Sequence, residues 1–190
     1  MKKGIAASKG YAIGTVFIKE EKEIEIIERA IENVEAEVER LQNAAKKSEE
    51  QLNKVKDKAL NELGAEKAAV FESHIELLSD PGFVGEMENL IKDSKVNAEK
   101  AVSDVLAMNV AIFESMEDEY MRERAADVKD VGNRVLKNLA GINDDLSEVP
   151  DNTVVVAYDL TPSDTAALDR SKVKAFLTNI GGRTSHSAIM

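Results

Sequence analysis

The sequence predicts a mixed fold of the α+β or α/β class, in which a small α/β domain is split by an inserted, mostly antiparallel helical bundle. In residues 4–19, short apolar segments alternate with glycines, a sequence pattern typical of strands and turns. The apolar residues that follow recur every three or four positions, as on one face of a helix. Towards the C-terminus short apolar strands return. We therefore expect an α/β domain over residues 1–19 and 144–190 and a helical domain over residues 20–143.

The first helical pattern is long. Steps of three and four residues connect the apolar positions from Ile24 to Ala59 without a slip. A seam of this kind fits either a core-facing helix of a bundle or an independent coiled coil. Its centre holds the small residues Ala45 and Ser48, which would pack poorly between two chains. We therefore predict a bundle helix that starts at Ile24.

Further helices follow with recognisable boundaries. Residues 66–78 form one apolar face, and Pro81 suits the first position of the next helix because it needs no amide donor there. Asn97 is an N-cap type that opens a third helix. A fourth extends to Leu139, and Gly141 fits its C-terminal end.

The C-terminal part reads as a strand, a helix and a second strand. Residues 153–157 are almost continuously apolar, as in a buried parallel strand, and residues 173–178 repeat the pattern. Between them, Thr161 and Asp164 have the spacing of a capping box around Pro162. In such a unit, ligands bind where the strands end, so an anion site is expected after residue 178.

The last ten residues, GGRTSHSAIM, carry the chemistry. The glycines at 181–182 let the backbone approach a ligand closely, and Arg183 adds a permanent charge. Residues 184–185 are N-cap types, which places His186 in a first helical turn, where amide groups attract anions. This string describes a histidine that carries or contacts a phosphoryl group. An ordinary glycine turn with a solvated histidine remains the alternative.

Composition excludes several classes of protein. The 190 residues carry a formal net charge of −11, which disfavours binding to nucleic acid, because phosphate backbones attract positive charge. Cysteine is absent, so disulfides and thiolate metal sites are impossible. No signal peptide or membrane-spanning run is apparent, and we expect a cytoplasmic protein with no membrane insertion. An acidic surface of this kind suits a partner with a basic face.

The tail and several earlier segments resemble the enzyme I family, the phosphoenolpyruvate-protein phosphotransferases of the bacterial sugar phosphotransferase system. Besides GGRTSHSAIM, the resemblance rests on four segments in the family's order, GIAAS at 4–8, EK…FESHI at 66–75, DEY…ERAADV at 118–128 and DLTPSDTA at 159–166. The shorter GGxTSH core is shared more widely among phosphoenolpyruvate-utilising enzymes with swivelling phosphohistidine domains.

The resemblance implies a transferase in which phosphoenolpyruvate phosphorylates a histidine, and the histidine phosphorylates the small carrier protein HPr. It implies a swivelling phosphohistidine subdomain over residues 1–19 and 144–190, incomplete at its C-terminus, and an HPr-binding helical subdomain over residues 20–143. It covers only the N-terminal part of the full enzyme, so we expect a fragment truncated just after the active-site histidine. The C-terminal barrel would bind phosphoenolpyruvate and Mg²⁺ and form a homodimer. Alone, the fragment should be inert towards phosphoenolpyruvate, with a poorly ordered α/β part.

Residue roles are carried over position by position. His186 matches the nucleophile, which attacks through Nε2, and Arg183 would neutralise phosphoryl oxygens. Thr165 matches the threonine whose hydroxyl contacts the active-site imidazole, and a surface hydroxyl on a helix is its alternative role. No metal ligands are expected in this chain.

The HPr-docking surface should lie on the helical domain. By resemblance, the residues in or near it are Glu66, Lys67, Phe71, His74, Leu77, Asp80 and Arg124. For His74, a role in helix packing is an equal alternative. Glu76 stands where enterobacterial sequences have methionine, which should make docking more electrostatic.

Two other functions compete with this interpretation. The chain could be the phosphohistidine domain of a pyruvate phosphate dikinase-like enzyme, although the helical insertion is characteristic of enzyme I. It could instead be a non-catalytic, acidic helical interaction module, for which the heptad helix and the charge are the evidence.

Overall fold

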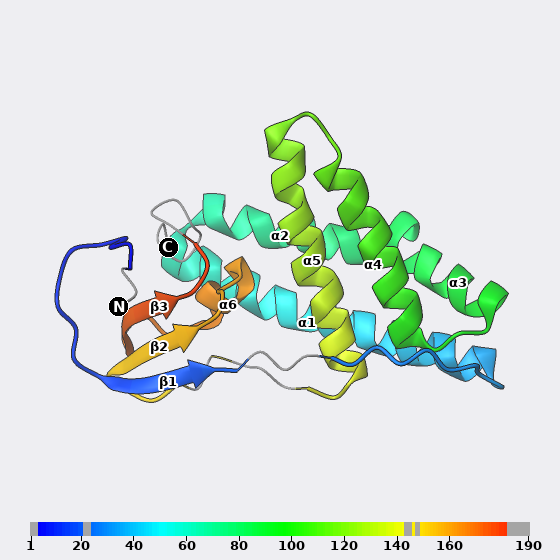
Figure 1. Cartoon of the computed structure of the whole chain (residues 1–190), viewed down its shortest axis with the longest axis horizontal. Coiled ribbons are helices and arrows are strands. Elements are labelled where there is room, and N and C mark those ends of the chain that lie inside the picture. Colours follow the sequence, from blue (N-terminus) through cyan, green and yellow to red (C-terminus); the bar gives the residue numbers. More distant parts are fainter. Residues whose placement is uncertain (1–3, 21–23, 143–145, 147–148, 182–190) are drawn as a thin grey trace. The chain divides into compact units, whose positions relative to one another are not determined.

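A computed structural model describes residues 4–20, 24–142, 146 and 149–181. The predicted combination of helices with a small sheet is confirmed (Figure 1). The chain divides into two compact units, one made of residues 1–23, 61–63 and 144–190, the other of residues 24–60 and 64–143. Among the described residues, no helix is both long and apolar enough to cross a membrane.

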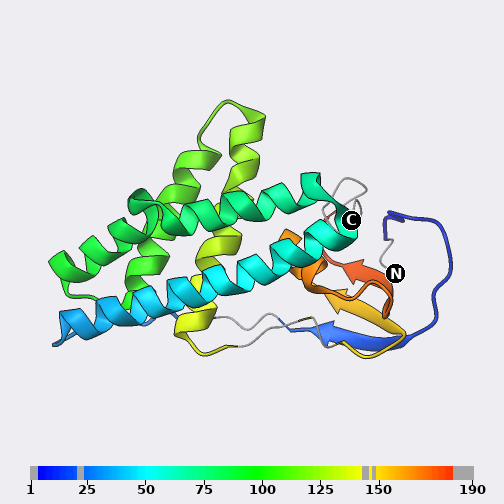
Figure 2. The same cartoon turned by 180° about the vertical axis from the view of Figure 1, so that it is seen from behind.

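In the part of the helical unit that the structure describes there are five α-helices and one π-helical turn. In chain order they are α1 (Val34–Leu63), α2 (Ala65–Ser79), η1 (Pro81–Gly85), α3 (Glu86–Ser94), α4 (Ala98–Glu114) and α5 (Glu119–Leu139). Both views show α1 and α2 as an antiparallel pair joined by a tight turn at Gly64 (Figures 1 and 2). The predicted helices over residues 66–78 and from Asn97 are confirmed.

The first helix begins ten residues later than the heptad pattern predicts. Asn33 caps α1, because its Oδ1 accepts a hydrogen bond from the Ala36 amide at 3.0 Å. The preceding segment pairs with the residues just before α4. Ile31 donates its amide to the carbonyl of Lys95 at 3.0 Å, and Ala30 forms an antiparallel bridge with Val96. The prediction of a helix from Ile24 was therefore wrong, since pairing with a distant segment outweighs the local periodicity.

A polar layer replaces the weak centre of the heptad seam. Ser48 is fully buried and donates its hydroxyl to the Ala44 carbonyl at 2.8 Å. Asn138 of α5 donates to the Ser48 hydroxyl at 2.8 Å and exchanges two hydrogen bonds of 3.1 Å with the Gln51 amide. Arg134 donates to the same Gln51 oxygen at 3.2 Å. The layer connects α1 to α5 through side-chain hydrogen bonds.

The N-terminus of α4 is held by carboxylates. Glu37 of α1 accepts a hydrogen bond from the Ala98 amide at 2.7 Å, and Arg40 pairs with both Glu37 and Glu99. Burial would raise the pKa of Glu99. The Asn97 amide, the residue's own backbone N–H and Arg40 outweigh burial and lower this pKa overall. Glu99 therefore stays ionised and connects α1 to α4.

The helical core depends on one close helix pair. Gly132 is buried in α5, and a Cβ placed on it would lie 2.6 Å from Cδ1 of Leu106 in α4. The largest fully buried side chains of this unit are Leu41, Leu52, Phe71, His74, Phe83, Met87, Ile91, Val102, Val131 and Val135. Apart from His74, aliphatic side chains, one methionine and two phenylalanines thus fill this core.

The other unit is built on a three-stranded parallel sheet in the order β1 (Thr15–Lys19), β2 (Thr153–Ala157) and β3 (Val173–Thr178). A short helix, α6 (Pro162–Ala167), connects β2 to β3. These elements match the predicted strands and helix of the C-terminal part.

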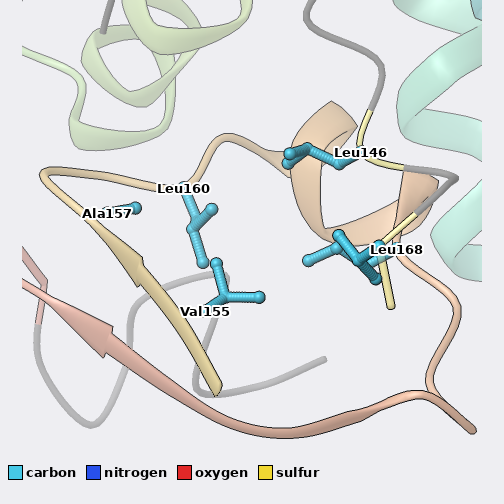
Figure 3. Packing of buried hydrophobic residues seen from close by; sticks show 6 residues of the cluster. Leu146, Val155, Ala157, Leu160 and Leu168 are labelled. Atoms are coloured by element: carbon cyan, nitrogen blue, oxygen red, sulfur yellow. The ribbon is translucent and has the colours of Figure 1, made fainter. Parts of the chain in front are cut away.

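One face of the sheet packs against α6 and its flanking loops. Figure 3 shows the buried cluster that meets there, which is made of Leu146, Val149, Val155, Ala157, Leu160 and Leu168. Phe17 of β1 packs against this cluster. On the opposite face, Val16 and Leu177 expose 59% and 60% of their surface.

Candidate functional site

The carboxyl ends of the three strands share one edge of the sheet, because all strands are parallel. After β3, the amides of Asn179 and Ile180 each donate to the Tyr158 carbonyl at 3.0 Å, so the loops that follow β2 and β3 are fastened together. Gly181 then takes a φ of 108°, which favours glycine. His186 and Arg183 come next in the sequence and lie outside the described residues. Of the predicted site, the structure therefore describes the carboxyl edge of the sheet.

Thr165 lies in α6, beside this edge, and is 8% exposed. Its hydroxyl lies 2.9 Å from the Pro162 carbonyl and 3.1 Å from the Thr161 carbonyl, and it donates its single proton within the helix. While the hydroxyl donates to one of these carbonyls, its oxygen can act towards a further group only as an acceptor. An imidazole N–H is a donor of the kind that this oxygen can receive.

The helix that carries Thr165 is capped as predicted. Thr161 Oγ1 accepts from the Asp164 amide at 3.1 Å, and Asp164 Oδ2 accepts from the Thr161 amide at 2.9 Å. The same Asp164 oxygen lies 2.6 Å from Nζ of Lys19 in β1. Sequence reasoning missed Lys19. The strand pattern could have indicated it, because Lys19 follows Phe17 by two residues and both side chains therefore lie on one face of the strand.

The predicted HPr-docking residues divide by exposure. Glu66 and Asp80, at the two ends of α2, are exposed, while Lys67, Leu77 and Arg124 are partly exposed. Phe71 is 0% exposed and His74 is 1% exposed. The two buried side chains are therefore placed to support a surface rather than to form it.

His74 connects α2 to α5. Its Nε2 lies 3.2 Å from Oδ1 of Asp127, its Nδ1 lies 3.6 Å from Oδ2 of Asp130, and its ring meets Phe71 edge-on with centroids 5.8 Å apart. Neither ring nitrogen makes a well-aligned hydrogen bond, so the ring is held by close packing between α2 and α5. The helix-packing alternative for His74 fits this geometry.

Metal binding finds no support in the ranges described. There, no three side chains of the histidine, aspartate or glutamate type are grouped to hold an ion.

Two family models match the chain. The model described as "PEP-utilising enzyme, N-terminal" covers residues 3–124, and the one described as "PEP-utilising enzyme, mobile domain" covers residues 149–190. The chain belongs to the PEP-utilising enzymes. Members of this family among its relatives include the phosphoenolpyruvate-protein phosphotransferases of Enterococcus faecalis and Priestia megaterium, at 48% and 49% identity over 192 and 188 residues.

These matches cover unequal shares of the proteins. They include 100% and 98% of this chain but 33% of each relative, so the chain spans about a third of the length of these PEP-utilising enzymes. These relatives are named as phosphotransferases, and the chain matches the part of them that it spans.

Solved structures of the family agree with the fold. The NMR solution structure of Enzyme I (nEIt) has a TM-score of 0.87 and 46% sequence identity, and the match covers 100% of this chain and 78% of that chain. A second structure, the N-terminal domain of Enzyme 1 - Nitrogen, has a TM-score of 0.72 and 25% identity, over 98% of this chain and 77% of that chain. The mixed fold with a small parallel sheet is therefore that of Enzyme I.

Proposed function

We propose that this chain accepts a phosphoryl group on His186 and exchanges it with HPr, as the HPr-binding and phosphohistidine part of an enzyme I. The observation that carries the proposal is the Thr165 hydroxyl, held as an acceptor at the sheet edge from which the GGRTSH segment continues. The relatives named phosphoenolpyruvate-protein phosphotransferase support the same reaction class.

The chemistry requires little of the protein beyond orientation and charge. The Nε2 lone pair of neutral His186 attacks phosphorus, a P–N bond forms, and the P–O bond to the enol oxygen of phosphoenolpyruvate breaks. The enolate takes a proton to give pyruvate. If Nδ1–H donates to Thr165, the lone pair stays on Nε2, because a neutral imidazole has one donor and one acceptor. Arg183 supplies positive charge to the phosphoryl oxygens.

The second transfer needs a docking surface for HPr on the helical unit. Glu66 and Asp80 supply exposed negative charge at the ends of α2, and Leu77 adds a partly exposed apolar side chain between them. A basic carrier face would be attracted to this arrangement, and the net charge of −11 would speed the encounter. Phe71 and His74 would hold the surface in place from below.

The remaining predictions belong to the same proposal. The α/β part over residues 1–19 and 144–190 would swivel as the phosphohistidine subdomain, while residues 20–143 bind HPr. Phosphoenolpyruvate binding, Mg²⁺ chemistry and dimerisation would be properties of a separate domain of the full-length enzyme. No step among the described residues is therefore assigned to a metal ion.

The test is transfer from phosphorylated HPr to this chain, followed by ³¹P NMR and backbone amide spectra. We expect an acid-labile phosphoryl group on His186 and shifted amide signals over residues 66–80. The His186→Ala variant should keep the amide shifts and take up no phosphate. Shifts without uptake in the unaltered chain would overturn the acceptor role. The absence of shifts would overturn the carrier-binding role and favour the generic interaction module.

Charge reversal at the predicted docking surface should weaken the HPr complex. Glu66→Lys replaces an exposed carboxylate by a cation, and we expect about a three- to tenfold higher Kd from the lost attraction. Titration calorimetry at two salt concentrations measures the effect, and the salt dependence should fall in the variant. Asp93→Lys makes the same charge change at an exposed position in the last turn of α3. Equal weakening by both variants would contradict a local docking surface.

A further inference from the structure

Lys19 has no role in the phosphoryl transfer proposed above. Its charged group contacts Asp164 Oδ2 at 2.6 Å, and the two side chains are only 9% and 13% exposed. Lysine and aspartate are seldom buried to this extent unless they are paired. The pair joins residues 145 positions apart in the sequence, so it serves the tertiary structure rather than a local turn.

The sheet register determines which face Lys19 occupies. Lys19 is opposite Ala157 and Phe17 is opposite Val155, and both partners belong to the buried cluster. Alternate residues of a strand share a face, so Lys19 lies on the face that α6 covers. It is also the last residue of β1, at the carboxyl edge of the sheet. The cation thus bridges the sheet edge and the first turn of α6.

The contact between Lys19 and Asp164 is coupled to Thr165, because Thr165 follows Asp164 directly in the chain. Asp164 Oδ2 accepts from Lys19 and from the Thr161 amide, so the carboxylate is shared between the sheet and the helix cap. Thr165 is the next residue in α6, and its own amide donates to the Thr161 carbonyl at 3.1 Å. A displacement of the cap would therefore move the Thr165 hydroxyl.

We propose that Lys19 is a positioning residue for phosphoryl transfer, which holds α6 through Asp164 and thereby fixes the Thr165 hydroxyl at the sheet edge that leads to His186. The inference rests on the proposed function, because it needs Thr165 to orient the imidazole. The capping box of Thr161 and Asp164 cannot position α6 against the sheet by itself. The Asp164 carboxylate stabilises the first turn of α6, whereas the Lys19 cation attaches that turn to β1.

The experiment measures single-turnover transfer from phosphorylated HPr to the whole chain. Lys19→Met should lower the transfer rate constant about ten- to a hundredfold, the loss typical of a slightly misplaced group, with the Kd for HPr unchanged. Lys19→Arg keeps the cation and should recover most of the rate. Lys174→Met, at an exposed β3 lysine whose Nζ lies 3.4 Å from the Ser171 carbonyl, is the matched control and should not change the rate.

Two further readouts separate positioning from loss of folding. The methyl signal of Thr165 should shift in Lys19→Met and stay in place in Lys174→Met. Asp164→Asn should slow transfer, and the double variant with Lys19→Met should be no slower than the worse single variant, because both break one contact.

Each alternative outcome has a definite meaning. Uptake by the unaltered chain with the full rate in Lys19→Met would overturn the positioning role alone. So would additive losses, or a loss that arginine does not rescue. No uptake by the unaltered chain, by contrast, would overturn the proposed function and this inference with it.

Discussion

Replacing Gly14 with alanine should detach β1 from the sheet. A Cβ at this position would lie 2.2 Å from the backbone carbonyl oxygen of Asn152 and 3.2 Å from a methyl group of Val154. The carbonyl cannot move aside, because it accepts the Thr15 amide at 2.8 Å and Asn152 already has a left-handed φ of 57°. We expect a loss of about 3 kcal/mol in the stability of this unit, at the upper end for overpacking. Hydrogen exchange of the Thr15–Lys19 amides would measure the effect.

Gly4 provides the matched control. A Cβ there would meet nothing within 4 Å, and its backbone does not have the positive φ of Gly10 or Gly64. Gly4→Ala should therefore leave hydrogen exchange in β1 unchanged. Since Lys19 ends β1, Gly14→Ala should also slow phosphoryl transfer. Full protection of β1 in Gly14→Ala would show that the close approach to Asn152 is not a constraint.

The Phe71→Ala variant should lose about 3–5 kcal/mol of unfolding free energy, the range for removing a fully buried phenylalanine. Phe71 is 0% exposed and carries the edge-on contact with His74, so its removal leaves a cavity beside the His74 contacts with α5. Urea denaturation followed by circular dichroism measures this loss. The Kd for HPr should change little once it is corrected for the folded fraction, because no part of this ring reaches the surface.

Leu77→Ala is the contrasting variant on the same helix. Leu77 is half-buried and belongs to the predicted docking set. It should lose less stability than Phe71→Ala and raise the Kd for HPr more. The opposite order of the two variants in the binding assay would mean that Phe71 becomes exposed when HPr docks. The two measurements together show which of the predicted residues form the interface and which support it.

Local signals predicted the elements whose boundaries depend on neighbouring residues. The capping box of Thr161 and Asp164 marked the start of α6, and the apolar runs marked β2 and β3. The segment before Asn33 was not predictable in this way, because the residues that pair with it, Lys95 to Asn97, lie more than sixty positions away. Long-range pairing overrode a helical pattern that was locally consistent.

The candidate site was predictable only in part, for the same reason. Motif spacing identified Thr165 and the tail, but the burial of His74 between Asp127 and Asp130 depends on how α5 packs against α2. Whether a predicted docking residue is exposed likewise depends on how the helices pack and not on its amino-acid type. Nothing in the local sequence of Lys19 indicates its partner, which follows from the strand register and the position of α6.

The layer formed by Ser48, Gln51 and Asn138 allows one alignment of α1 along α5. Aliphatic contacts are non-directional, so an aliphatic seam specifies the alignment of two helices less strictly than hydrogen bonds do. A hydroxyl and two amides specify it more strictly, since a shift of one helical turn would remove the partners of the buried Ser48 hydroxyl and of the partly buried Gln51 and Asn138 amides. The layer therefore fixes how far α1 can slide along α5, a property that the aliphatic contacts around it would not supply alone.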